Sequence, residues 1–292
     1  MATKLIKPVV IIVGPTASGK TDLAIKTALA YDGEVICADS RTIFQDMNIG
    51  TAKPTITERQ GVAHWGLDLR KPGERFSAAE FQAYARVAID DIQSRGKLPI
   101  IVGGTGLYID SLIFDYDFPE QIDDKQRERL EAMSVEELYK YCTDNNITLT
   151  SNHKNKRHLI GAISRSNRAD KRSVTPQQNF TVVGIATDKP TLRNNIVART
   201  EHMFESGVVD EAKMLGEKYG WDGEAMTGNI YPIIRQYLNG EVSSDQAKQA
   251  FCDRDWQLAK RQMTWFRRNP YIIWTLKEQG EQIIHSRLST GK

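Results

Sequence analysis

The stretch Gly14-Pro15-Thr16-Ala17-Ser18-Gly19-Lys20-Thr21 decides the fold, because it matches the phosphate-binding pattern G-x-x-x-x-G-K-[ST] at every fixed position. The apolar run at 9–13 is typical of a buried strand, and residues 22–28 are typical of a helix. A loop between them can direct backbone N–H groups at an anion, with Lys20 at the terminal phosphate and the Thr21 hydroxyl available to Mg²⁺. We therefore expect a phosphate or pyrophosphate site here, called the phosphate loop below.

The rest of the first half alternates between strand and helix patterns. Residues 34–38 form a second short strand-like run, and residues 99–102 a third. Between them, Ser77 and Glu80 match the capping box of a helix that runs to about Arg95. This alternation predicts an α/β fold with a mostly parallel sheet flanked by helices, like that of P-loop NTPases.

Three loops should meet at one edge of this sheet, because ligands of parallel sheets lie beyond the carboxyl ends of the strands. They are the phosphate loop, residues 39–42 and residues 103–106. Lys20 and Mg²⁺ would stabilise an anionic leaving group, and Asp39 would accept a proton from the nucleophile. Thr105 would offer its hydroxyl to a ligand oxygen. Two plainer interpretations stay open: Asp39 caps a helix or supports the Mg²⁺ shell, and Gly103-Gly104 is an ordinary turn.

Composition narrows the class of protein. The formal net charge is only +2, but residues 153–172 and 254–268 are rich in Lys and Arg, which suits a polyanionic partner or simply a solvated face. Three widely spaced cysteines indicate neither a disulfide framework nor a metal pattern, which suits a reducing cytoplasm. The chain starts without a signal-peptide layout, and residues 9–13 are too few to span a bilayer, so we expect no membrane partner.

Six motifs follow one another along most of the chain. They are GPTASGKT at 14–21, ADSR at 38–41, NIGTAKP at 48–54, FSAAEF at 76–81, IVGGTGLY at 101–108 and AKRQMTWFR at 259–267. In this order they resemble the tRNA dimethylallyltransferase family, also called tRNA isopentenyltransferases. The phosphate loop alone is shared with many NTPases, whereas the second and third motifs are far more specific.

The resemblance implies transfer of a dimethylallyl group from dimethylallyl diphosphate to the exocyclic N6 amine of the adenine just 3′ of the tRNA anticodon. It implies Asp39, Lys20 and Thr105 as catalytic residues, Mg²⁺ at Thr21 as the cofactor, and a further donor contact from Arg199. The implied partners are the donor and the tRNA anticodon arm, and a monomer suffices for one tRNA. The implied donor-binding residues of the loop are Gly14, Thr16, Ala17, Ser18, Gly19, Lys20 and Thr21. The implied tRNA-binding residues are Asp39, Ser40, Arg41, Thr42, Thr105, Arg157, His158, Lys260, Arg261, Trp265 and Arg268.

The resemblance also implies a division of the chain. Residues 1–116 and 175–292 would form the P-loop α/β core, and residues 117–174 a small helical insertion that clamps the anticodon arm.

Near the end of the core lies a basic helix pattern, for which the resemblance implies contact with tRNA. Lys260, Thr264 and Arg268 recur at helical spacing, with Arg261 and Trp265 on the adjoining stripe. Lys and Arg would meet phosphates, and the Trp face could stack a base. Core packing is the plainer interpretation of Trp265.

Some positions depart from the family pattern. Asn195 stands where the family usually has Arg, which implies weaker donor binding or a substitute role for Arg193. Thr42 stands where Gln is common, and Pro232 stands where a cation is usual. Two other functions therefore stay open. A small-metabolite kinase would turn over ATP without prenyl transfer, and a non-catalytic relative would bind the anticodon arm and give no product.

Overall fold

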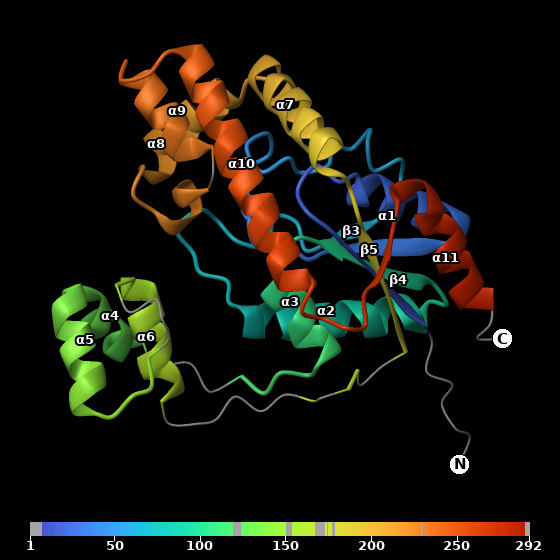
Figure 1. The fold of residues 1–292 in the computed structure, drawn as a ribbon, viewed down its shortest axis with the longest axis horizontal. Coiled ribbons are helices and arrows are strands. Elements are labelled where there is room, and N and C mark those ends of the chain that lie inside the picture. The colour runs from blue at the N-terminus through green and yellow to red at the C-terminus, as the bar shows by residue number, and fades with distance from the viewer. Residues whose placement is uncertain are drawn as a thin grey trace. The chain divides into compact units, whose positions relative to one another are not determined.

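The computed structural model describes residues 8–118, 124–149, 154–166, 173, 175–176, 179–228 and 230–289 (Figure 1). The chain divides into two compact units. One comprises Met1–Ile113 with Pro176–Lys292, and the other comprises Phe114–Thr175. This second unit corresponds to the insertion that we predicted at residues 117–174. Each unit is described separately.

A six-stranded sheet forms the centre of the first unit, and its strands pair in parallel in the order β3-β2-β4-β1-β5-β6. All five residues of β1 are buried, because it lies between β4 and β5. The predicted α/β class with a parallel sheet is confirmed. The strands are β1 (Val9–Val13), β2 (Gly33–Cys37), β3 (His64–Trp65), β4 (Leu98–Gly103), β5 (Phe180–Ile185) and β6 (Ile273–Thr275).

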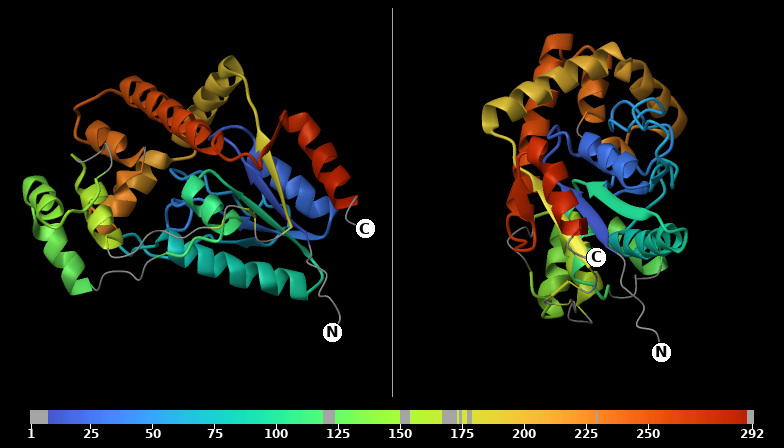
Figure 2. Two further views of the ribbon diagram at one scale, coloured as in Figure 1. Left: turned by 60° about the horizontal axis from the view of Figure 1, so that its bottom comes forward. Right: turned by 90° about the vertical axis from the view of Figure 1, so that its right-hand side faces the viewer.

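Helices cover both faces of this sheet (Figures 1 and 2). On one face, α1 (Lys20–Ala30) and α11 (Lys277–Ser289) bury Leu23 and Ile284 against Val10 and Ile12 of β1. On the other face lie α2 (Ala78–Ser94) and α3 (Gly106–Ile113), which pack on each other. The predicted capping box of α2 is present: the Ser77 hydroxyl accepts the Glu80 N–H, and the Glu80 carboxylate accepts the Ser77 N–H.

A second group of helices extends the first unit beyond the sheet (Figure 1). It buries its own core, in which Leu215, Tyr231 and Phe251 pack against Ile43 and Met47 of the loop after β2. The long α10 crosses back to contact α3 at the sheet. The elements are α7 (Lys189–Glu205), α8 (Val208–Tyr219), the 3₁₀ helix η1 (Glu224–Thr227), α9 (Tyr231–Leu238) and α10 (Ser244–Phe266).

The second unit is helical. It contains α4 (Asp124–Ala132), α5 (Val135–Asp144) and α6 (Lys156–Arg165), which bury Leu138, Cys142 and Leu159 in a small core. His158 is exposed on α6; Arg157 lies in the same helix, but its side chain falls outside the described part. Among the described residues of the whole chain, no helix is both long and apolar enough to cross a membrane.

Candidate functional site

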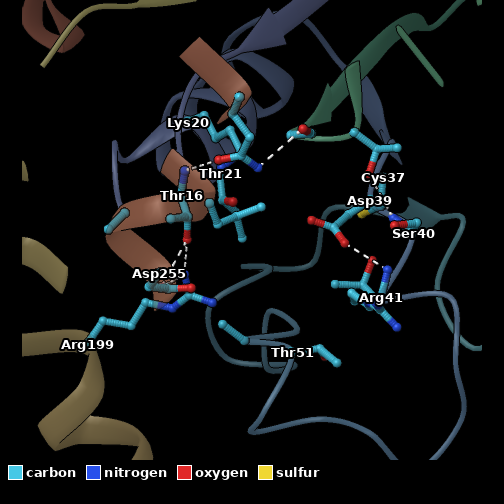
Figure 3. A pocket seen from close by; sticks show the side chains of 18 of the residues that line it. Thr16, Lys20, Thr21, Cys37, Asp39, Ser40, Arg41, Thr51, Arg199 and Asp255 are labelled. Carbon is cyan, nitrogen blue, oxygen red and sulfur yellow. Dashed lines mark hydrogen bonds and ion pairs between the residues drawn. The ribbon is translucent and has the colours of Figure 1, made fainter. Parts of the chain in front are cut away.

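A cavity of about 560 Å³ opens at the carboxyl ends of the strands (Figure 3). The three predicted loops meet there: the phosphate loop, residues 39–42 and residues 103–105 all line it. The loop of residues 50–54 and side chains from the helical part of the unit complete the wall. These are Arg199 on α7, Tyr231 on α9, and Phe251, Asp255, Leu258, Arg261 and Gln262 on α10.

The phosphate loop has the backbone that an anion site needs. Gly19 caps α1 with φ 79°, a left-handed conformation that favours glycine, and leaves the first N–H groups of the helix without a capping side chain. Thr16, Ala17, Gly19, Lys20 and Thr21 line the cavity. Of the predicted loop residues, Gly14 and Ser18 do not line it in the described structure, and Ser18 is buried behind the wall.

Lys20 lies in a desolvated position. Its ammonium donates to the Pro15 carbonyl at 3.1 Å. Burial lowers the pKa of Lys20 to about 8, and the negative charges of Asp39 and Asp255 offset part of this effect. A phosphate anion beside this ammonium would raise its pKa again, so the site favours an anionic ligand.

Two helical residues that we did not predict from the sequence support the phosphate loop. Gln262 of α10 accepts the Thr16 N–H through Oε1 at 2.8 Å and donates from Nε2 to the Gly104 carbonyl at 3.2 Å. It therefore joins the phosphate loop to the glycine turn. Gln262 lies within the quoted motif at 259–267, but a polar residue in a basic helix gave no signal of this contact.

Asp255 of α10 is the second unpredicted residue. Its buried carboxylate pairs with the Arg199 guanidinium at 3.2 Å and lies 3.5 Å from the Thr16 hydroxyl, which Arg199 also contacts (Figure 3). Arg199 is thus held at the edge of the phosphate loop, as its predicted donor contact requires. An acidic residue beside a proposed diphosphate site was unexpected, but here it serves to fix a cation.

The Asn195 departure has a structural counterpart. The Asn195 side-chain amide donates to the Ala17 carbonyl at 3.0 Å and so holds the phosphate loop from outside. Arg193 does not replace the missing guanidinium: its side chain stacks 4.5 Å over the Trp256 ring and, in the described structure, does not line the cavity.

Asp39 directs its carboxylate into the cavity (Figure 3). Oδ1 accepts the Arg41 N–H at 2.8 Å, which fixes the side chain in a local turn. In the described chain the residues that follow form turns and a bridge, so the helix-cap interpretation of Asp39 is wrong. The other carboxylate oxygen points into the open space.

Thr105 is placed next to Asp39 by the glycine turn. Its hydroxyl accepts the Ser40 N–H at 3.0 Å, and its N–H donates to the Ala38 carbonyl at 3.2 Å. A Cβ on Gly103 would overlap that carbonyl, so this close approach requires glycine. Gly103-Gly104 is therefore more than an ordinary turn. The proton of the Thr105 hydroxyl is available to a ligand oxygen.

The loop at 48–54 is held by a residue that sequence patterns did not reveal. Glu211 of α8 accepts the N–H groups of Asn48, Ile49 and Gly50 at 2.7–2.8 Å, and the Tyr231 hydroxyl at 2.9 Å. Burial, together with the Glu211 charge, raises the pKa of Tyr231 far above its usual range. This buried anchor fixes one wall of the cavity.

The predicted tRNA-binding residues differ in their surroundings. Arg41 donates to the Glu224 carbonyl at 3.1 Å, so its guanidinium is tied to η1. Thr42 is buried, and its hydroxyl has no partner within the described structure. Arg261 lines the cavity and is exposed, and Lys260 is exposed on the same helix.

Trp265 is not core packing, because 37% of the residue is exposed. Its ring lies against Gly106, and its Nε1 donates to Asp110 at 2.7 Å. Arg268 does not extend the helical stripe, since α10 ends at Phe266 and Arg268 lies in the turn that follows. It is exposed there beside Trp265.

The fold and cavity define a class: a parallel α/β protein whose phosphate loop faces an acidic residue across a cavity completed by helices. A family model described as IPP transferase matches residues 42–269. The chain is 39% identical over 289 residues to the tRNA dimethylallyltransferase of Acetivibrio thermocellus, covering 93% of this chain and 92% of that protein. It is 38% identical over 278 residues to the enzyme of the same name from an Exiguobacterium species, covering 91% and 89%.

Among solved structures, the tRNA isopentenylpyrophosphate transferase of Bacillus halodurans matches with a TM-score of 0.75 and 31% identity, covering 98% of this chain and 97% of that one. The chain therefore belongs to the tRNA dimethylallyltransferase family.

Proposed function

We propose that this protein transfers a dimethylallyl group from dimethylallyl diphosphate to the N6 amine of the adenine 3′ of the anticodon in tRNA, and releases diphosphate. The names of the relatives support the reaction class. The observation that carries the proposal is the meeting of Asp39, Thr105 and the phosphate loop at one cavity. A proton acceptor and a leaving-group site then share one space, as this transfer requires.

The chemistry follows from these positions. The adenine N6 attacks the allylic carbon of the donor, the bond from that carbon to the diphosphate oxygen breaks, and the N6 proton passes to the Asp39 carboxylate. Lys20 and the backbone N–H groups of the phosphate loop stabilise the charge that develops on the departing diphosphate. Arg199, held by Asp255, adds a second cation at the same loop. Thr105 orients the reacting groups through its hydroxyl.

The donor set fits Mg²⁺. Thr21 offers a hydroxyl oxygen on the cavity wall, Asp39 faces the same space, and Mg²⁺ commonly completes its shell with water and substrate phosphates. We propose Thr21 as its protein ligand. When bound, the ion would neutralise charge on the diphosphate.

The tRNA would approach from the exposed side of the cavity. Arg261 at the cavity, together with the exposed Lys260 and Arg268, would supply positive charge for the phosphate backbone, and the exposed Trp265 would offer a stacking face. We propose Ser40, Arg41 and Thr42 as contacts to bases near the reacting adenine, and the second unit, with Arg157 and His158, as the clamp on the anticodon arm. An extruded adenine costs a few kcal/mol, which these contacts must offset. A single copy supplies all of these groups, so we propose a monomer.

The test is a prenyl-transfer assay. Purified protein is mixed with Mg²⁺, dimethylallyl diphosphate and an anticodon stem-loop that carries adenine at the target position, and the digested nucleosides are analysed by mass spectrometry. We expect an adenosine heavier by one dimethylallyl group. Asp39→Asn should lower turnover by about two to four orders of magnitude and leave stem-loop binding largely intact.

The outcomes also separate the alternatives. Stem-loop binding without product under any donor would favour the non-catalytic relative. ATP turnover stimulated by a small hydroxylated metabolite would favour the kinase. Wild-type turnover by Asp39→Asn would remove Asp39 from the role of base.

A further inference from the structure

The phosphate loop has a carboxylate at its edge that should repel an anionic donor. Asp22, in the first turn of α1, lines the cavity two residues after Lys20, and its side chain is 63% exposed. A diphosphate bound at the N-terminus of α1 would lie within the range of this charge, since the Debye length is about 8 Å at physiological ionic strength. A cation that cancels the charge of Asp22 would therefore favour binding of the anionic donor.

Lys277 occupies the position from which this can be done. It is the first residue of α11, and its ammonium pairs with Asp22 at 2.8 Å. Its side chain lies against Gly19 of the phosphate loop: a Cβ on Gly19 would be 2.8 Å from both Cδ and Nζ of Lys277.

The placement is electrostatically unusual. A cation beside a helix N-terminus opposes the helix dipole, whose positive end lies there. Asp22 offsets that cost in the free protein, and a bound anion would offset it further. Lys277 thus contributes little to α1 alone but shapes the potential that a donor meets.

We propose that Lys277 is a further positioning residue of the donor site. By pairing with Asp22 over Gly19, it neutralises the acidic edge of the phosphate loop and so sets the affinity for diphosphate. This inference rests on the proposed function only in naming the donor, because the binding of pyrophosphate itself can be measured without tRNA or prenyl transfer.

The test is a double-mutant cycle read by calorimetric titration with inorganic pyrophosphate and Mg²⁺. Lys277→Gln should weaken pyrophosphate binding by about three- to tenfold, because it leaves the Asp22 charge unpaired. Asp22→Asn should strengthen binding, since it leaves the Lys277 charge unpaired. The double variant Asp22→Asn/Lys277→Gln should return to within about twofold of wild type, as the net charge at the edge is again zero.

The chain offers a matched control. Lys26 of α1 pairs with Glu281 of α11 at 3.5 Å, so this pair joins the same two helices away from the loop. Lys26→Gln should leave pyrophosphate affinity unchanged, which separates an effect on the site from a general effect on helix packing or net charge. The loss in Lys277→Gln should also shrink as salt is raised.

Several outcomes overturn the inference. Unchanged affinity in Lys277→Gln, an equal loss in Lys26→Gln, or a double variant as weak as Lys277→Gln alone would each do so. Wild type that binds no pyrophosphate would overturn it as well. Failure of prenyl transfer with the cycle intact would instead count against the proposed function and leave the role of Lys277 standing.

Discussion

Lys20 should make the free protein less stable than a variant without it. Its pKa is lowered from 10.5 to about 8, mainly by burial, which corresponds to about 3 kcal/mol held against the charged side chain. Lys20→Met removes this cost and also removes the bond to the Pro15 carbonyl, worth about 1 kcal/mol. Part of the Lys20 side chain faces the open cavity, where solvent screens its charge, so the free-energy cost of burial is smaller than this figure. We expect Lys20→Met to be more stable by about 1–2 kcal/mol near neutral pH.

The downward shift of the Lys20 pKa also predicts how stability changes with pH. Below about pH 8 both the folded and the unfolded wild type carry the Lys20 proton, so the full cost is present. Between about 8 and 10.5 the folded state releases the proton and the unfolded state keeps it, so wild-type stability rises with pH. The advantage of Lys20→Met should therefore fade over this range.

The assay is urea unfolding followed by tryptophan fluorescence at about pH 7 and about pH 10. All five tryptophans of the chain lie in the first unit, so the signal reports on that unit alone. Lys20→Met should also lose pyrophosphate binding, which would show that the charge that destabilises the free protein is the one that binds the anionic ligand. A variant less stable than wild type at neutral pH would refute the reasoning about burial.

The remaining predictions concern other charged groups. Glu34, bound by Arg95, Trp65 and Lys97, has its pKa lowered to about 2, so as pH falls from 4.5 through 2 wild type should lose about 1–2 kcal/mol more in urea unfolding than Glu34→Gln loses. Glu211→Gln should lower the free energy of unfolding by about 2 kcal/mol or more, because the Glu211 carboxylate accepts four hydrogen bonds. Tyr231→Phe should lower it by about 1 kcal/mol in the same urea measurement, because it removes one of these bonds. Equal losses in the two variants would argue against Glu211 as the anchor of the loop at 48–54. Lys260→Ala and Arg268→Ala should each weaken stem-loop binding and reduce the slope of log K against log salt by roughly 0.7 to 0.9; an unchanged slope would remove that residue from the RNA contact.

The sequence predicted strands β1, β2 and β4 and three walls of the cavity because their signals are local, but it did not predict the short strands β3 and β6. The phosphate loop, the capping box at Ser77 and the glycine turn at 103–104 each depend on a few neighbouring residues. The parallel topology then required the strand ends to meet. Lys20, Asp39 and Thr105 could be placed together by this reasoning alone.

The supporting residues could not be found in this way. Gln262, Asp255 and Glu211 reach the loops from helices whose packing no periodicity specifies. The misplaced Arg268 has a local cause: Pro270 disfavours helical geometry at Asn269, and the helix ends at Phe266, before the charge pattern stops at Arg268. The basic residues therefore continue in the sequence beyond the last residue of α10, where helical spacing no longer places their side chains.

The bond between the Thr16 N–H and Gln262 joins residues that are 246 positions apart. A ribosome must therefore synthesise nearly the whole chain before the first functional motif it made can be held in shape. Until α10 has emerged, the nascent phosphate loop lacks the contacts from both Gln262 and Asp255. Such distant closure slows folding. A prematurely terminated product that ends before residue 255 would carry an intact loop sequence, yet the loop would lack the supports that preorganise it for an anion.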